Sequence, residues 1–178
     1  MFTYSQSKNE ILRKILISVF AVISAIALPQ ICHYIGVLTG TGANLGAMLL
    51  PMHIPVLLAG FYGGAVVGTT VGVISPLISF AISGMPSAAL LPFMIIELAV
   101  YGLVSGILSK KNMNAVLKTA IVLLSGRIAR ALAVLTSIYA FGNEKLAITA
   151  AYMFIVEGII GTIIQLIIIP FVISRKKA

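Results

Sequence analysis

The sequence predicts an all-α integral membrane protein in which six transmembrane helices form one bundle. Of the 178 residues, 60% are hydrophobic and 9% are charged, whereas a soluble domain usually has about 25% charged residues. Apolar runs that approach the roughly 20 residues of a bilayer crossing recur along the chain, separated by short polar segments. We therefore expect one transmembrane domain over residues 1–178 and no soluble domain.

Three helices are expected in the first half of the chain. The first follows a short polar segment and stops at Pro29, because proline lacks the backbone N–H that a helix interior needs. Residues 30–50 are glycine-rich and are expected to form a connection folded back over the membrane face. Ser75-Pro76 is expected to kink the third helix. These helices are expected over residues 11–28, 51–62 and 65–82.

Three further helices are expected in the second half. The segment SGMPSAALLP, residues 83–92, is expected to be a loop that leads into the fourth helix. That helix ends by Ser109, just before two lysines. The fifth is expected over residues 115–139 and the sixth over residues 146–173.

The distribution of basic residues predicts the orientation of the bundle. Three groups of Lys and Arg fall on one side of the membrane together with both chain termini, whereas the opposite side has only Lys145, beside Glu144. Since short cytoplasmic segments are enriched in Lys and Arg, both termini are expected in the cytoplasm. The basic groups are Lys8, Arg13 and Lys14; Lys110, Lys111 and Lys118; and Arg175, Lys176 and Lys177.

The stretch GANLGAMLLPMHIPVLLAGFYGG, residues 42–64, enters the membrane through an uncharged segment rich in Gly and Pro. A segment that only anchored a protein would not need Asn44, His53 and this many glycines, so the stretch is typical of a ligand-capturing mouth. Asn44 is either a turn residue or a ligand contact. His53 is expected to hydrogen-bond to the loop or to a bound ligand, because the chain has no zinc-binding spacing.

Four ionisable residues are predicted inside the membrane: Glu97, Arg127, Arg130 and Glu157. Each is roughly 13 to 25 Å along its helix, so these side chains should face the bundle interior and find partners. One interpretation makes the arginines a clamp for an anionic or amide-rich solute. The other makes them structural ion pairs with the two glutamates, neutral overall. Arg127 is the stronger binding candidate, because it follows Gly126, where a ligand could approach closely.

Two weaker sequence features are an aromatic residue and a pair of alanines. Tyr101 is a weaker binding candidate, since aromatic residues at helical spacing more often pack than bind. Ala21 and Ala25 give the first helix a small-residue stripe, which allows close approach of another helix in lipid.

Several classes of function are excluded by what the sequence lacks. It has no GxxxxGK[ST] phosphate loop, no GxSxG with a serviceable histidine and no EExxxR with paired histidines. The basic residues form small clusters between apolar runs, which argues against nucleic acid as a partner. We therefore expect no catalytic residues, no metal site and no cofactor in this chain.

Several segments follow one another in a characteristic order and spacing along nearly the whole chain, after the small-residue stripe on the first helix. They are LLPMHIPVLLAGFYGG, then GVISPLISFAISGMPSAALLPFMIIELAVYGLVSGIL, SGRIAR in the fifth helix, and Gln165 to Pro170 in the sixth. Together they resemble the substrate-binding S component of an energy-coupling factor (ECF) vitamin transporter.

The resemblance implies a vitamin pocket open to the outside and capped by residues 40–50 and 83–92. It implies docking on a transmembrane scaffold subunit through Ala21 and Ala25, and two ATPase subunits whose ATP drives inward delivery. It also implies a multi-pass location in a prokaryotic plasma membrane, with no enzymatic activity. The substrate-binding residues are expected to be Asn44, His53, Glu97, Tyr101, Arg127, Arg130 and Glu157.

Pantothenate is the first choice of substrate, because Arg127 offers a partner for a carboxylate and the chain has no Trp and only 14 Tyr and Phe residues for ring stacking. Cobalamin is second, because a mouth lined with small and Met residues suits a bulky ligand. The competing interpretations are a self-sufficient permease or channel and, less favoured, an intramembrane enzyme using Glu97 or Glu157 with His53.

Overall fold

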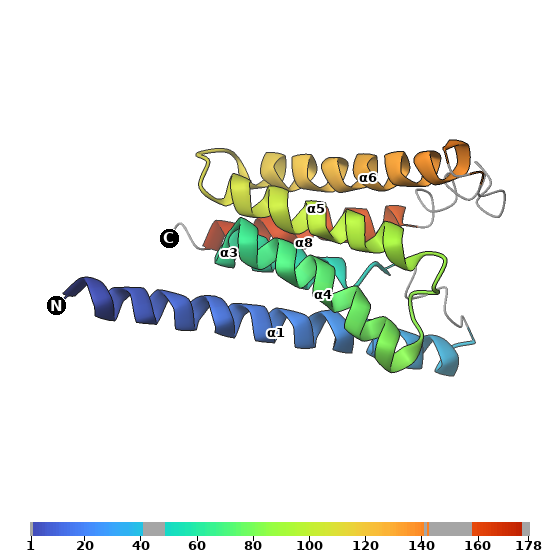
Figure 1. Ribbon diagram of the computed structural model, residues 1–178, viewed down its shortest axis with the longest axis horizontal. Coiled ribbons are helices and arrows are strands. Elements are labelled where there is room, and N and C mark those ends of the chain that lie inside the picture. Colours follow the sequence, from blue (N-terminus) through green and yellow to red (C-terminus); the bar gives the residue numbers. More distant parts are fainter. Residues whose placement is uncertain (1, 41–48, 141, 143–157, 176–178) are drawn as a thin grey trace.

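The computed structural model describes residues 2–40, 49–140, 142 and 158–175. Within these residues the secondary structure consists of helices, without strands, and six helices form a bundle (Figure 1). This confirms the predicted all-α fold class. The helices are α1 (Phe2–Leu38), α3 (His53–Gly63), α4 (Ala65–Ser83), α5 (Leu91–Ser109), α6 (Ala115–Tyr139) and α8 (Ile159–Ser174).

Helix α1 is much longer than predicted. It continues through Pro29 to Leu38 and occupies part of the segment that was expected to be a connection. The predicted stop at Pro29 is therefore wrong. In lipid, no water replaces the hydrogen bonds of an unwound backbone, so a helix that loses one bond at a proline still continues. Pro76 is likewise inside α4 without ending it.

The later helices match the predicted ranges closely. Helix α6 begins and ends where it was predicted, at Ala115 and Tyr139, and α5 ends at Ser109. The first part of the sixth predicted helix, together with Lys145, lies outside the described residues, and α8 fills the remainder.

Four of the helices, α1, α4, α5 and α6, are long and apolar enough to cross a membrane. Helix α3 has 11 residues, a length of about 16 Å, which is about half of a hydrocarbon core of about 30 Å. Helix α3 ends at Gly63, and Gly64 adopts a φ of 90° before α4 begins. Only glycine adopts this backbone conformation easily, so Gly64 accounts for the break between the predicted second and third helices.

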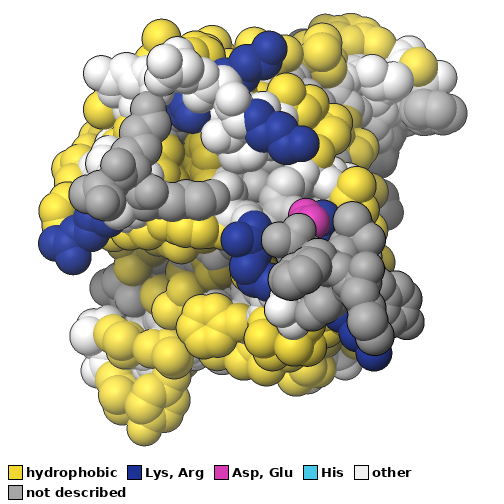
Figure 2. Space-filling model, turned by 90° about the vertical axis from the view of Figure 1, so that its left-hand side faces the viewer, with side chains coloured by type: hydrophobic (Ala, Val, Ile, Leu, Met, Phe, Trp, Pro, Cys, Tyr) yellow, Lys and Arg dark blue, Asp and Glu magenta, His cyan; other side chains and the backbone are white. Residues whose placement is uncertain are grey.

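Both ends of the chain approach the same end of the bundle. The start of α1, the α5–α6 turn and the end of α8 lie together, while the segment between α4 and α5 lies at the opposite end (Figure 1). Lys and Arg side chains gather on the first of these ends (Figure 2). We name it the basic end. The expectation that this end faces the cytoplasm comes from the positive-inside rule and stays a prediction.

Glycine residues bring α4 and α5 into backbone contact. A Cβ at Gly102 would collide with backbone atoms of Gly68, and a Cβ at Gly72 would collide with the backbone of Leu98. Gly60 lets α3 approach α5 in the same way, close to Ser105. Small residues therefore set the positions of α3, α4 and α5, which is how helices associate closely in lipid.

Candidate functional site

A charged cluster surrounds Glu97 in the interior of the bundle. The Glu97 carboxylate is fully buried. Its Oε2 accepts a hydrogen bond from Arg130 Nη1 at 2.6 Å and lies 3.6 Å from His53 Nε2. Its Oε1 accepts a hydrogen bond from the Tyr101 hydroxyl at 3.1 Å and lies 3.6 Å from Arg127 Nε. We call these five residues the Glu97 cluster.

Three helices supply the Glu97 cluster. Glu97 and Tyr101 are one turn apart on α5, so both project from the same face. Arg127 and Arg130 are three residues apart and share a face of α6. His53 is the first residue of α3, and its ring contacts Tyr101 edge to face with centroids 5.4 Å apart. Because α3 is short, its first residue reaches the interior of the bundle.

Gly126 leaves room for the Tyr101 side chain. A Cβ at this position would collide with the ring of Tyr101. The space that Gly126 was expected to leave for a ligand beside Arg127 is therefore filled by the ring of Tyr101. The hydroxyl of the same residue donates a hydrogen bond to Glu97.

Arg127 also connects α6 to the start of α8. Its Nη2 donates to Thr162 Oγ1 at 3.1 Å and to the Gly158 carbonyl at 3.4 Å. Thr162 Oγ1 in turn donates to the Gly158 carbonyl at 2.8 Å. A Cβ at Gly158 would collide with the Arg127 guanidinium, so a larger residue here would require the Arg127 side chain to shift.

The charge balance of the Glu97 cluster is positive among the described residues. One carboxylate faces two guanidinium groups, and the Arg127 and Arg130 side chains are only 14% and 12% exposed. The amino-terminal ends of α3 and α8 also meet here, and each contributes a partial positive charge. Neither ring nitrogen of His53 has a hydrogen-bond partner within the part of the chain that the structure describes. The cluster is therefore suited to a buried anionic or hydrogen-bonding ligand.

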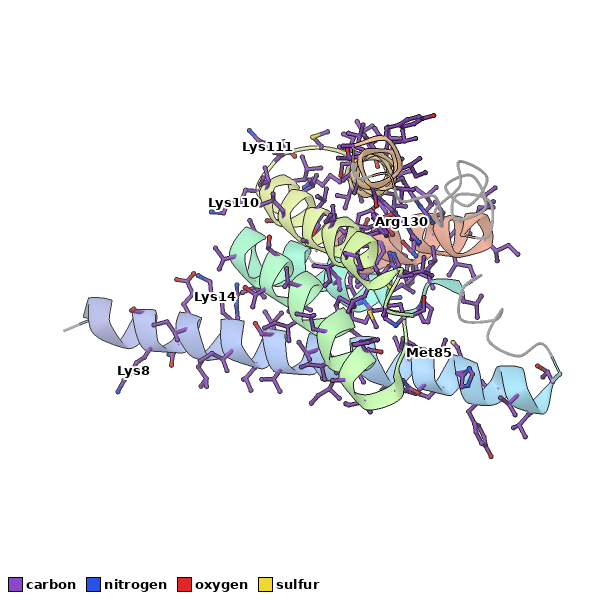
Figure 3. The ribbon with its side chains drawn as sticks, turned by 45° about the vertical axis from the view of Figure 1, so that its right-hand side comes forward. Lys8, Lys14, Met85, Lys110, Lys111 and Arg130 are labelled. Atoms are coloured by element: carbon purple, nitrogen blue, oxygen red, sulfur yellow. The ribbon has the colours of Figure 1, made fainter. Side chains whose placement is uncertain are left out.

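The cluster lies well away from the basic end of the bundle. In Figure 3, Arg130 and Met85 are found in a different part of the bundle from Lys8, Lys14, Lys110 and Lys111. Helix α6 carries Arg127 at its middle, the thirteenth of 25 residues. Both arginines thus lie away from the basic end, and their depth in the membrane stays a prediction.

Five of the seven predicted binding residues come together in the Glu97 cluster. The other two, Asn44 and Glu157, lie outside the described residues. The predicted pairing of arginines with Glu97 is present, since Arg130 is in direct contact with it. A neutral arrangement of two arginines and two glutamates stays a prediction, because it depends on Glu157.

Ala21 and Ala25 are placed differently from what the docking prediction requires. Ala21 is 6% exposed and Ala25 has no exposed surface, and both belong to the hydrophobic core of the bundle. The small-residue stripe therefore packs α1 against its own chain, and in this arrangement neither side chain is accessible to a scaffold subunit. Docking of a scaffold subunit at these two positions stays a prediction.

Two contributors to the site were not identified from the sequence. Thr162 and Gly158 hold the guanidinium of Arg127, and the only signal for them is a glycine followed four residues later by a threonine. That spacing is too common in membrane helices to single out. Among the residues that the structure describes, no group of three His, Cys, Asp or Glu side chains could hold a metal ion.

The fold and the buried charges define a multi-pass membrane protein. A family model described as the ECF transporter, substrate-specific component, matches residues 13–173. The chain therefore belongs to this family, as the sequence resemblance predicted. Comparisons with curated proteins and with solved structures give no match.

Proposed function

We propose that this chain binds a water-soluble vitamin from the outside of the cell and delivers it inward with an ATP-driven coupling module. Membership of the substrate-specific component family supports a substrate-binding role in an ECF transporter. Pantothenate is the first candidate for the vitamin and cobalamin the second.

The observation that carries the choice of pantothenate is the excess of positive charge around Glu97. Arg130 is the direct partner of Glu97 at 2.6 Å, whereas Arg127 is 3.6 Å from the same carboxylate. Arg127 is therefore the better donor for a ligand carboxylate. The amino-terminal ends of α3 and α8 favour an anion at the same place. His53 and Tyr101 supply groups that can hydrogen-bond to the hydroxyl and amide parts of pantothenate.

We propose that ATP hydrolysis and inward delivery are carried out by other subunits, as in other members of the family. The chain has no phosphate-binding loop, so ATP would be used by two ATPase subunits that act through a transmembrane scaffold. Since Ala21 and Ala25 are buried, we propose that the scaffold contacts the outward face of α1, where Phe20 and Ile23 are exposed.

Calorimetric titration of the purified chain in detergent tests the binding step. Pantothenate is expected to bind tightly, and pantothenol, which replaces the carboxylate with an alcohol, is expected to bind much more weakly. Arg127→Ala should weaken pantothenate binding by about 10- to 150-fold, the value of a hydrogen bond to a charged group of about 1.5–3 kcal/mol. It should leave the weak binding of pantothenol nearly unchanged.

Arg175→Ala is the matched control. Arg175 directly follows α8, which ends at the basic end (Figure 1), and its guanidinium stacks on Phe171. Equal affinity for pantothenate and pantothenol would show that the ligand carboxylate does not contribute to binding. Tight binding of cobalamin without binding of pantothenate would select the second candidate.

Reconstitution in liposomes tests the transport step. The chain alone should not move the bound vitamin across the vesicle membrane, whereas the chain with scaffold and ATPase subunits should do so when ATP is supplied. Transport by the chain alone would favour the alternative of a self-sufficient permease.

A further inference from the structure

Helix α8 carries a buried amide close to the Glu97 cluster. Gln165 is 1% exposed, and its Nε2 has no hydrogen-bond partner among the residues that the structure describes. Buried polar groups in proteins are almost always paired, because an unpaired buried donor destabilises the fold. Gln165 is therefore a candidate donor to a bound ligand.

Gln165 belongs to the face of α8 that points into the bundle. Gly161, Gln165 and Ile169 are spaced by four residues and are all buried, so they share one side of the helix. Thr162, which accepts a hydrogen bond from Arg127 Nη2 at 3.1 Å, is three residues before Gln165. Gln165 is thus about 4.5 Å further along α8 than the contact with Arg127, or one helical turn.

The side chain of Gln165 leans toward the Glu97 cluster. In an α-helix the Cα–Cβ bonds tilt toward the amino terminus. The amino-terminal end of α8 is at the cluster, because Gly158 and Thr162 contact Arg127 there. The other end of α8 is joined to the end of α3, where the Tyr62 hydroxyl donates to the Val172 carbonyl at 3.1 Å. Gln165 lies between these two contacts.

The position of Gln165 suits a ligand with an acceptor one helical turn from an anionic group. This step rests on the proposed function, in which an anionic solute binds beside Arg127. Since Nε2 can only donate, the group that it recognises must be an acceptor. In an N-acylated β-amino acid, four bonds join the carboxylate carbon to the amide carbonyl carbon, a distance of about 5 Å when extended. This length matches the spacing of about 4.5 Å along α8.

We infer that Gln165 is a further substrate-binding residue, which donates a hydrogen bond to the amide carbonyl oxygen of an N-acylated amino acid. The carboxylate of that ligand binds beside Arg127, and its amide extends along α8 toward Gln165. His53, whose ring nitrogens are also without a hydrogen-bond partner within the described residues, faces the same ligand from α3.

The test compares probes that share a carboxylate and a chain length. N-acetyl-β-alanine has the whole amide, 5-oxohexanoate keeps the carbonyl but has CH₂ in place of N–H, and hexanoate has neither group. The rise in melting temperature of the purified full-length chain in detergent gives their affinities. In wild type, N-acetyl-β-alanine and 5-oxohexanoate should each bind about tenfold more tightly than hexanoate, as expected for one hydrogen bond.

Gln165→Met removes the amide and keeps a side chain of similar length. It should bring 5-oxohexanoate and hexanoate to equal affinity, without weakening hexanoate. The melting temperature without ligand should be unchanged or higher, because an apolar group replaces an unpaired buried amide. If this variant does not fold, Gln165→Asn retains an amide on a side chain one methylene shorter and should show a smaller preference for 5-oxohexanoate than wild type.

Thr119→Val is the matched control. It removes a fully buried polar group elsewhere in the core, where the Thr119 hydroxyl donates to the Ala115 carbonyl at 2.9 Å near the start of α6. The tenfold preference for 5-oxohexanoate over hexanoate should persist in this variant. Its loss in both Thr119→Val and Gln165→Met would overturn the assignment, because the preference would then depend on the core in general.

The same experiment separates this inference from the choice of pantothenate. If pantothenate does not bind but the probes follow the expected order, the choice of vitamin is wrong and the role of Gln165 is supported. If pantothenate binds tightly while the probes bind equally in wild type, the role of Gln165 is wrong and the proposed function stands. Two further results would overturn the inference: no binding of any probe, or an unchanged preference in Gln165→Met together with a lower melting temperature, which would assign Gln165 to the fold alone.

Discussion

Helix α5 presents two faces that hold the bundle together by different means. On one face, Gly102 and Gly106 bring the backbone against α4. On the other, Glu97 and Tyr101 project into a charged cluster with α3 and α6. The first face contains almost no side chain, and the second contains a buried charge with four polar neighbours.

The difference reflects what lipid offers as a solvent. Apolar side chains gain little by leaving lipid for the bundle interior, so association depends on close packing and on polar contacts. The glycine face provides close packing but little chemistry, because it leaves no space for a ligand. The Glu97 face packs less closely, but it has charged and hydrogen-bonding groups that a solute can also contact. Binding is therefore expected on the polar face of α5, with the glycine face as its rigid support.

The largest effect is expected from Glu97→Gln. It leaves the guanidinium groups of Arg130 and Arg127 buried without their carboxylate, and breaking a buried pair in this way costs about 3–5 kcal/mol. Thermal unfolding of the purified chain in detergent should show a strongly reduced melting temperature. Adding Arg130→Met to this variant should recover part of the loss.

Glu10→Gln is the control for this prediction. It removes the carboxylate of an exposed pair with Lys14 on α1 and should leave the melting temperature unchanged, since exposed pairs contribute little. Equal melting temperatures of Glu97→Gln and wild type would show that the Glu97 cluster does not stabilise the fold.

An intermediate effect is expected from Gly102→Ala. The added methyl group collides with the backbone of Gly68. Because a backbone cannot change rotamer as a side chain can, α4 and α5 must separate. Overpacking of this kind costs about 1–3 kcal/mol, and the melting temperature should fall accordingly. Leu103→Phe adds bulk on the neighbouring residue, which is 42% exposed, and should change little. A similar drop in both variants would contradict a specific glycine contact.

The smallest effect is expected from Tyr101→Phe. It removes one hydrogen bond to Glu97 Oε1 and keeps the ring that packs against Gly126 and His53. The loss of stability should be about 1 kcal/mol. Pantothenate affinity should fall less than in Arg127→Ala. A loss of affinity larger than that of Arg127→Ala would assign the ligand contact to Tyr101 instead.

Much of the fold was predictable because each boundary has a local cause. The run from Ala115 to Tyr139 lies between polar segments, and both ends of α6 were predicted. Pro29 misled the prediction because the rule for helix ends assumes that water can satisfy a broken backbone, whereas in lipid α1 continues to Leu38.

The candidate site was partly predictable for a similar reason. An ionisable side chain inside a membrane must face the interior, which selected Glu97, Arg127 and Arg130 without any structure. The partners of each charge were not predictable. Which arginine lies nearest Glu97, and that Thr162 and Gly158 bind Arg127, depends on the rotation and height of α6 and α8.

The sequence by itself determined that this protein is a helical membrane bundle with a basic end, because hydropathy and charge act residue by residue. Only the tertiary structure decided that Ala25 is an internal packing residue, that Gly126 accommodates an aromatic ring, and that five distant polar residues form one cluster. These outcomes depend on how far apart the helices stand and which faces they turn toward one another. Those two quantities are set by contacts between segments far apart in the chain, and no local pattern encodes them.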